Sequence, residues 1–196
     1  MILPIVAYGD PILKKVAEEV PENFENLKGL VADMFETMYN ANGVGLAAPQ
    51  IGKSIRIFVI DPSPFADDEE LSKEEKEELK KGKKAFINPQ VVKRNGEDWA
   101  FSEGCLSIPG ITEDIFRPEE ITLTYRDEDF NPHTETFTGL MARVIQHEYD
   151  HIEGILFTDK ISSLKKRLIK NKLNNIVIGK VSVDYRMRFP KAKKRH

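Results

Sequence analysis

Residues 140–153 restrict the fold most, because they join a helical pattern to metal-binding side chains. Apolar residues recur there at the spacing of one helical face. Inside the pattern, QHEYDH (146–151) carries two histidines four residues apart, with a glutamate directly after the first. On a helix, His147 and His151 share one face and Glu148 lies beside it, where it can reach a water activated by a metal. The rest of the chain must fold around a helix that holds either a metal or two partly buried histidines paired with carboxylates.

A third metal ligand has to come from elsewhere, because a catalytic site of this kind uses three protein ligands and keeps one position open. The remaining histidines, His133 and His196, lie in a predicted turn and at the C-terminus. Upstream stands EGCLSIPG (103–110), which contains the only cysteine of the chain, Cys105. A single cysteine excludes an internal disulfide and leaves the thiol free for chemistry. Taken alone, this thiol fits an inert buried residue as well as a ligand.

Length and composition favour one globular domain over residues 1–196. Hydrophobic residues make up 40% and charged residues 31% of the chain. No apolar run is long enough to span a bilayer, and the N-terminus lacks the basic and apolar regions of an export signal. We therefore expect a cytoplasmic protein without a membrane partner.

Hydrophobic periodicity predicts a mixed arrangement of helices and strands around this central helix. Residues 24–41 and 162–175 show helical spacing. Strands are predicted at 55–60, 85–94, 98–104, 119–127, 135–138 and 181–189. Turn residues separate the middle strands, which favours an antiparallel sheet in the centre of the chain.

The segment 62–84 contains eight acids, six lysines and very little apolar material. It is predicted to be a charged surface insertion, because it cannot bury a core of its own. Ser72 followed by Glu75 indicates a capped, solvated helix, and disorder is the alternative.

Charge is distributed unevenly along the chain. Residues 165–196 hold 12 Lys/Arg and one acid, a net charge of +11, whereas residues 1–164 carry −14. Such a basic segment is either a solubilising end or a contact for an anionic partner such as RNA. We expect no DNA partner.

Three blocks of the sequence resemble, in order and spacing, the signature motifs of the peptide deformylases. These blocks are GVGLAAPQ (43–50), EGCLS (103–107) and QHEYDH (146–151). The resemblance covers residues 2 to about 160. It implies an α+β fold in which antiparallel β-sheets surround the central H-E-x-x-H helix. It further implies a hydrolase that removes the formyl group from the N-terminal formylmethionine of newly synthesised proteins and releases formate.

The resemblance also implies the ligand set and the oxyanion donors. Cys105, His147 and His151 would bind one divalent metal, typically Fe(II) in this family, with Zn, Ni or Co able to occupy the site. The backbone N–H of Leu106 and the side-chain amide of Gln50 would stabilise the oxyanion. Formylated nascent peptides would be the substrates.

Chemical reasoning on the residues adds the remaining roles. Glu148 is predicted to accept a proton from the water and to donate one to the leaving amine. Gly43 and Gly45, on either side of Val44, let the backbone approach an extended peptide.

Three apolar side chains, Val44, Leu140 and Val144, are predicted to line a pocket for the methionine. Leu140 and Val144 fit plain core equally well. Glu103 and Arg117 form either a pair behind the ligands or a routine surface ion pair.

Two features differ from the best-known members of the family. The 62–84 insertion lengthens the stretch between the first two motifs and can reshape the rim of the site. The end of the chain reads as a basic helix and a strand instead of a helix alone, so no functional residue is transferred to 165–196. Two rival functions remain: a zinc endopeptidase, which would need neither Cys105 nor the GVGLAAPQ loop, and a non-catalytic metal-binding module.

Overall fold

The computed structural model describes residues 1–190. Its α-helices are α1 (Leu27–Asn40), α2 (Lys73–Lys80), α3 (Gly139–Ile152) and α4 (Ser163–Val177). Its strands are β1 (Ile5–Val6), β2 (Gly45–Ala47), β3 (Ile57–Ile60), β4 (Lys84–Cys105), β5 (Ile108–Arg126), β6 (Pro132–Thr138) and β7 (Met187–Arg188). Short 3₁₀ helices lie at Pro11–Lys14, Ala48–Ile51, Ser63–Asp67 and Phe157–Asp159. In this part of the chain, no helix is long and apolar enough to cross a membrane.

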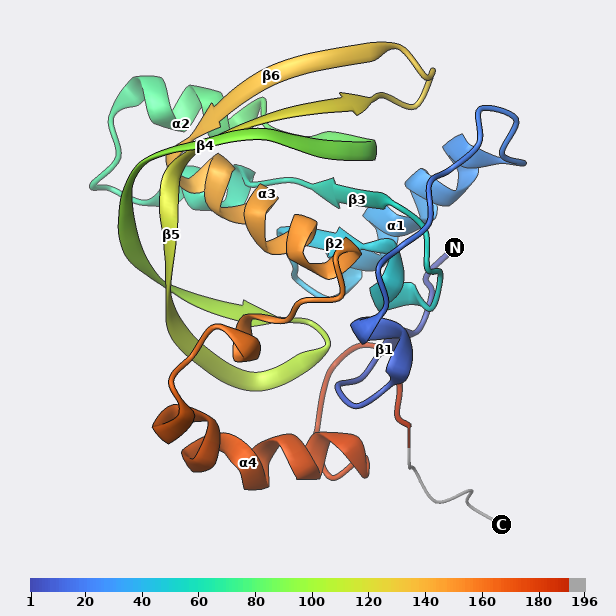
Figure 1. Ribbon diagram of the computed structural model, residues 1–196, viewed down its shortest axis with the longest axis vertical. Helices are drawn as coiled ribbons and strands as arrows, with labels where there is room; N and C mark the ends of the chain where they lie inside the picture. Colours follow the sequence, from blue (N-terminus) through green and yellow to red (C-terminus); the bar gives the residue numbers. More distant parts are fainter. Residues whose placement is uncertain (191–196) are drawn as a thin grey trace.

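The main sheet is antiparallel, with the strand order β2-β3-β4-β5-β6. Two of its strands are unusually long: β4 has 22 residues and β5 has 19. Their pairing contains four register shifts, and shifts of this kind bend and twist a strand pair. As a result, β4 and β5 curve around α3, which lies on the concave side of the sheet (Figure 1). The predicted α+β arrangement is confirmed.

Helix α3 is a core helix, because nearly all of its residues from Met141 onward are buried. Its apolar side chains pack against the inner face of the sheet, where Phe58 and Phe86 stack with ring centroids 4.7 Å apart. The curved sheet encloses the helix with side chains from several strands. The H-E-x-x-H motif therefore lies in the interior of the molecule, where all of its residues except His147 are buried.

The charged insertion contains the capped helix that its sequence indicated. The Ser72 side chain accepts a hydrogen bond from the Glu75 N–H, and the Glu75 carboxylate accepts one from the Ser72 N–H. Most of α2 is exposed, but Leu79 is buried. This helix and the preceding 3₁₀ turn pack together beside the sheet.

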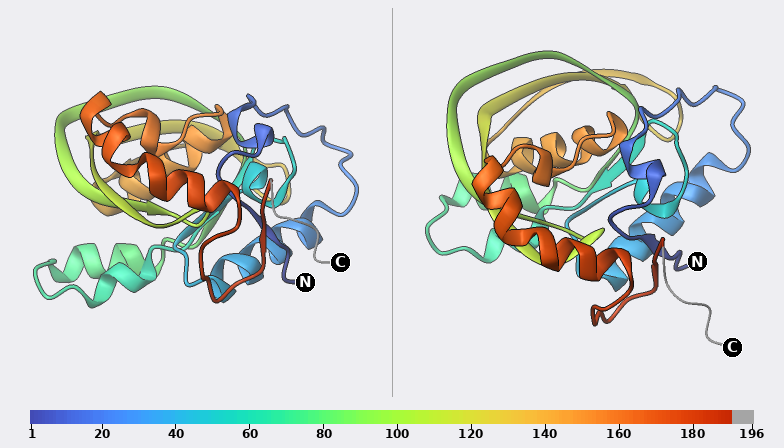
Figure 2. Two further views of the ribbon diagram at one scale, coloured as in Figure 1. Left: turned by 90° about the horizontal axis from the view of Figure 1, so that it is seen from below. Right: turned by 60° about the horizontal axis from the view of Figure 1, so that its bottom comes forward.

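The end of the chain differs from the prediction in one respect. Helix α4 forms as expected and packs near the tip of the β4–β5 hairpin (Figures 1 and 2), where Lys165 Nζ lies 2.7 Å from Glu113 Oε2. The strand predicted over 181–189 is wrong in extent, because only Met187–Arg188 pairs, in parallel with β1. Side chains do alternate between half-buried and exposed across the segment. Alternation of side chains indicates that one face is buried, but a strand also needs a hydrogen-bonding partner. The partner strand β1 has only two residues, so only two residues of this segment pair.

Candidate metal centre and active site

The three candidate ligands meet at one point. Cys105 is the last residue of β4, and His147 and His151 lie one turn apart on α3. Their ligand atoms all lie within 4.8 Å of one another, and Cys105 Sγ is 3.3 Å from His151 Nε2. One thiolate and two imidazoles form a donor set that suits Fe(II) and Zn(II). The residues present therefore fit one divalent ion.

A buried charge network holds the first histidine in place. Glu103 Oε2 accepts a hydrogen bond from His147 Nδ1 at 2.9 Å, which leaves the other ring nitrogen free to bind a metal. Arg117 donates to both Glu103 oxygens at 2.6 and 2.9 Å and to Asp150 at 2.7 Å. Burial alone would raise the pKa of Glu103, but Arg117 and His147 hold it well below its usual range. The Glu103–Arg117 pair is buried, so it is not a surface ion pair.

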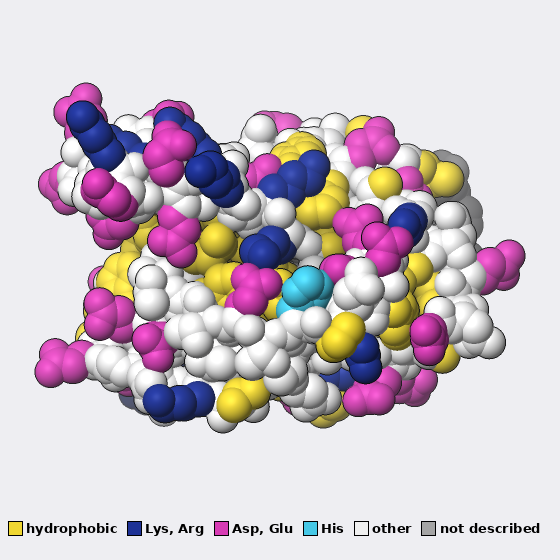
Figure 3. Space-filling model, turned by 90° about the horizontal axis from the view of Figure 1, so that it is seen from above, with side chains coloured by type: hydrophobic (Ala, Val, Ile, Leu, Met, Phe, Trp, Pro, Cys, Tyr) yellow, Lys and Arg dark blue, Asp and Glu magenta, His cyan; other side chains and the backbone are white. Residues whose placement is uncertain are grey.

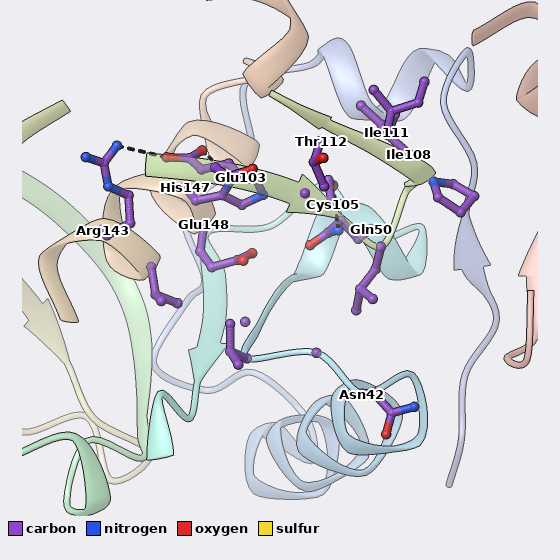
Figure 4. A pocket seen from close by; sticks show the side chains of 18 of the residues that line it. Asn42, Gln50, Glu103, Cys105, Ile108, Ile111, Thr112, Arg143, His147 and Glu148 are labelled. Atoms are coloured by element: carbon purple, nitrogen blue, oxygen red, sulfur yellow. Dashed lines mark hydrogen bonds and ion pairs between the residues drawn. The ribbon is translucent and has the colours of Figure 1, made fainter. Parts of the chain in front are cut away.

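Sequence reasoning missed Arg143, which completes this network. Its guanidinium donates to Glu103 at 3.1 Å and to the backbone carbonyls of Ile115 and Trp99 (Figure 4). It also stacks on the Trp99 ring, 4.3 Å from the centroid. The signal was present in the sequence, since Arg143 lies four residues before His147 and shares its helical face.

The carboxylate of Glu148 is buried and only partly satisfied. Its side chain is 4% exposed, and within residues 1–190 Oε2 has no hydrogen-bond partner. Burial raises the pKa of Glu148 to about 7. A carboxyl group with a pKa near neutrality can both accept and return a proton.

Close approach of Gly45 to Glu148 explains why a glycine is needed in the first motif. A Cβ atom on Gly45 would lie 2.3 Å from Glu148 Oε1, which is too close for any real contact. The cavity wall therefore leaves room for the carboxylate only because residue 45 has no side chain.

Replacing Gly45 with alanine should displace Glu148 and lower turnover. We expect a loss on the order of 10²-fold, because a misplacement of about 1 Å costs that much in a positioned catalytic group. Gly43→Ala is the comparison, since the nearest atoms to a Cβ there would belong to Leu106, at 2.8 Å, and Met38, at 3.4 Å, and not to Glu148. Steady-state kinetics on both variants check this: Gly45→Ala should lower kcat, whereas Gly43→Ala should act mainly on KM because Gly43 lies along the peptide path. An equal fall in kcat in both variants would show that Glu148 is not what Gly45 accommodates.

Gln50 lies beside the Cys105 end of the site. It is 1% exposed and sits in the 3₁₀ helix Ala48–Ile51. Its Oε1 accepts from the Ala47 N–H at 2.8 Å, which orients the amide NH₂ toward Cys105 Sγ at 3.5 Å and Ser107 Oγ at 3.3 Å. This NH₂ group is a fixed donor next to the ligand cluster.

These side chains surround a cavity of about 530 Å³ (Figure 4). Its lining includes Gly43, Val44, Gly45, Gln50, Glu103, Cys105, Leu106, Val144, His147 and Glu148. The outer face in Figure 3, by contrast, carries Asp/Glu and Lys/Arg side chains interspersed over its surface. The structure thus brings all but one of the predicted substrate-contacting and catalytic residues to a single cavity.

Leu140 is the exception and requires a correction. It does not line this cavity but lines a second hollow, together with Glu75 and Leu79 of the insertion. Leu140 lies in the first turn of α3, one turn before Val144. Helical spacing identified the shared face but could not tell how far along the helix the cavity extends.

Two aromatic residues that sequence reasoning missed line the apolar part of the cavity. Phe65 and Phe101 pack edge to face, with ring centroids 6.0 Å apart. Phe65 is the only aromatic residue in the 62–84 insertion, which was a signal that this segment contacts the rest of the protein. The insertion therefore contributes directly to the wall of the site.

Comparisons with known proteins agree on one family. The family described as polypeptide deformylase matches residues 2–167. The chain is 64% identical to a peptide deformylase of Christiangramia forsetii and 61% identical to one of Flavobacterium johnsoniae, in each case over 99% of both chains. Its fold is similar to the crystal structure of a peptide deformylase from Legionella pneumophila, with a TM-score of 0.75 and 39% identity over 89% of this chain and 95% of that one.

Proposed function

The chain belongs to the polypeptide deformylase family, and we propose that the cavity around Glu148 is where it carries out the family's reaction. That reaction removes the formyl group from an N-terminal formylmethionine and releases formate. One observation carries the assignment of the site: three ligand atoms lie within 4.8 Å of one another, and two of their residues, Cys105 and His147, line the same cavity as the buried carboxylate of Glu148.

Cys105, His147 and His151 would hold the divalent ion. When bound, this ion would acidify a water molecule and offer positive charge to the developing oxyanion. Glu148 accepts the proton of the attacking water at its free Oε2 and then donates it to the amine nitrogen as the C–N bond breaks. A single carboxylate therefore serves both proton transfers.

Two donors would stabilise the oxyanion of the tetrahedral intermediate. The Gln50 side-chain amide is held in place because its Oε1 accepts a hydrogen bond from the Ala47 N–H. It therefore needs little reorganisation during the reaction. The backbone N–H of Leu106 is the second donor. Leu106 lies in the two-residue turn between β4 and β5, directly after the ligand Cys105.

The peptide part of the substrate would bind along β2. Within residues 1–190, β2 pairs only with β3, which places it at the edge of the sheet. An extended peptide can add to such an edge by main-chain hydrogen bonds, and Gly43 and Gly45 let it come close. Val44 and Val144, with Phe65 and Phe101, would surround the methionine side chain.

We propose that residues 1–196 form one catalytic domain, so the protein should unfold in a single transition.

Product analysis on three matched peptides tests this function. A formyl-Met peptide should release formate, whereas the acetylated peptide should react far more slowly because the larger acyl group must fit beside the ion. The peptide with a free amino terminus should remain intact. Cleavage of that free peptide would indicate an endopeptidase, and absence of formate with the metal-loaded protein would remove the proposed function.

We propose that Fe(II) is the native ion, as is typical of the family, because one thiolate and two imidazoles can hold Fe(II) as well as Zn(II). Air or peroxide should then inactivate the iron form by oxidising both Fe(II) and Cys105. The nickel or zinc form should keep its activity longer. Activity followed over time for each metal form checks this, and equal decay rates would contradict it.

We propose that the basic C-terminal segment 165–196 aids contact with the ribosome in the cytoplasm, where nascent chains emerge. Within the described residues, α4 presents several lysines to solvent. Residues 191–196 (KAKKRH) lie outside the described part of the chain. Binding through phosphate contacts should weaken steeply with salt. Unchanged co-sedimentation at low salt after deletion of 191–196 would remove this role from the terminal cluster.

A further inference from the structure

We propose that Tyr185 is a positioning residue for the Leu106 N–H, so that the C-terminal segment takes part in catalysis through the oxyanion donor. The Tyr185 hydroxyl donates a hydrogen bond to the Leu106 carbonyl at 2.7 Å, across 79 residues of sequence. Tyr185 also lines the active-site cavity. This inference rests on the proposed function, since it concerns the donor assigned to the oxyanion.

The turn that carries Leu106 is held from several sides. Cys105 and Ile108 pair across it, so Leu106 and Ser107 form the turn itself. Ser107 is fixed twice, because its Oγ lies 3.3 Å from the Gln50 amide and its carbonyl accepts from the Tyr8 N–H at 2.8 Å. Tyr185 supplies the hydrogen bond at Leu106. Without it, the peptide units on either side of Leu106 could rock, and its N–H would lose a fixed direction.

Tyr185 is itself held by the pairing of the two ends of the chain. The Ile5 N–H donates to the Arg186 carbonyl at 2.9 Å, and the Ala7 N–H donates to the Arg188 carbonyl at 2.9 Å. The next residue after Ala7 is Tyr8, which binds Ser107. The strand pair β1–β7 therefore fixes both contacts with the turn. Figure 2 shows the two ends of the chain coming together.

The environment of Tyr185 suits a permanent donor. Its ring packs against the apolar cluster that includes Ile5 and Leu46, and Leu106 packs against the same cluster. Burial raises the pKa of Tyr185 to about 12, so the hydroxyl keeps its proton at neutral pH. A phenylalanine can fill the same space, so the hydroxyl can be removed without a cavity.

The test compares Tyr185→Phe with Tyr125→Phe. Tyr125 is buried, and its hydroxyl also donates a hydrogen bond, to Glu135, but it does not line the cavity. Tyr185→Phe should lower kcat for a formyl-Met peptide about 3- to 10-fold and leave KM within about 2-fold, because one neutral hydrogen bond positions the donor. Metal content should stay the same. Tyr125→Phe should leave all three quantities unchanged.

A thioformyl-Met peptide separates positioning from a structural role. Sulfur accepts hydrogen bonds weakly, so the kcat loss in Tyr185→Phe should shrink to less than about 2-fold with this substrate. The Leu106 amide should also exchange with solvent faster in Tyr185→Phe than in Tyr125→Phe. Equal losses on both substrates, an unchanged kcat, or a loss explained wholly by missing metal would each overturn the inference. Formate release by the unaltered protein keeps these outcomes distinct from failure of the proposed function.

Discussion

Replacement of Glu148 by alanine is expected to leave about one metal per chain and to lower formate release by about 10²–10⁴-fold, the usual contribution of a positioned general acid–base. The metal should stay because Glu148 is not among the three residues whose ligand atoms converge. Turnover should fall because, in the proposed mechanism, the same carboxylate serves both proton transfers.

Glu148→Gln is the matched variant, since it keeps the shape of the side chain and loses only its basicity. It should be nearly as inactive as Glu148→Ala, with the metal retained. Metal loss from either variant would make Glu148 a ligand. Near-normal turnover would remove it from the mechanism.

Replacement of a ligand should have a different signature. Cys105→Ala and His147→Ala are each expected to lose the metal, because the two remaining protein ligands hold a divalent ion poorly. Formate release should fall with metal content. His133→Ala is the control, because His133 pairs with Asp127 on the outer part of the sheet and should leave both quantities unchanged. Full metal occupancy in Cys105→Ala would exclude the thiolate as a ligand.

Local pattern in the sequence was sufficient for the elements whose signals are local. The spacing of apolar residues predicted α1 and α3, and the Ser72–Glu75 pair predicted the cap of α2. The ligand set rested on the family motifs and not on periodicity, because nothing local places Cys105 next to two histidines that lie more than 40 residues later.

Features that depend on long-range packing could not be read from the sequence. The curvature of β4 and β5 arises from register shifts, which depend on how two strands meet. Leu140 was assigned to the cavity because it shares a helical face with Val144. In the structure, however, Leu140 and residues of α2 line a different hollow at that end of α3. The hydrogen bond from Tyr185 to Leu106 depends on the pairing of β7 with β1. The alternating pattern in 181–189 indicates a strand but does not tell which strand it pairs with.

Deformylation by this chain should depend on one divalent ion at the Cys105–His147–His151 site. The decisive measurement is a titration of metal-free protein with Fe(II) in the absence of oxygen, with formate release followed from a formyl-Met peptide. Activity should be absent at the start, rise linearly and level off at one ion per chain. Formate release by the metal-free protein, or a rise that continues well beyond one ion per chain, would show that the reaction does not depend on a single ion at this site.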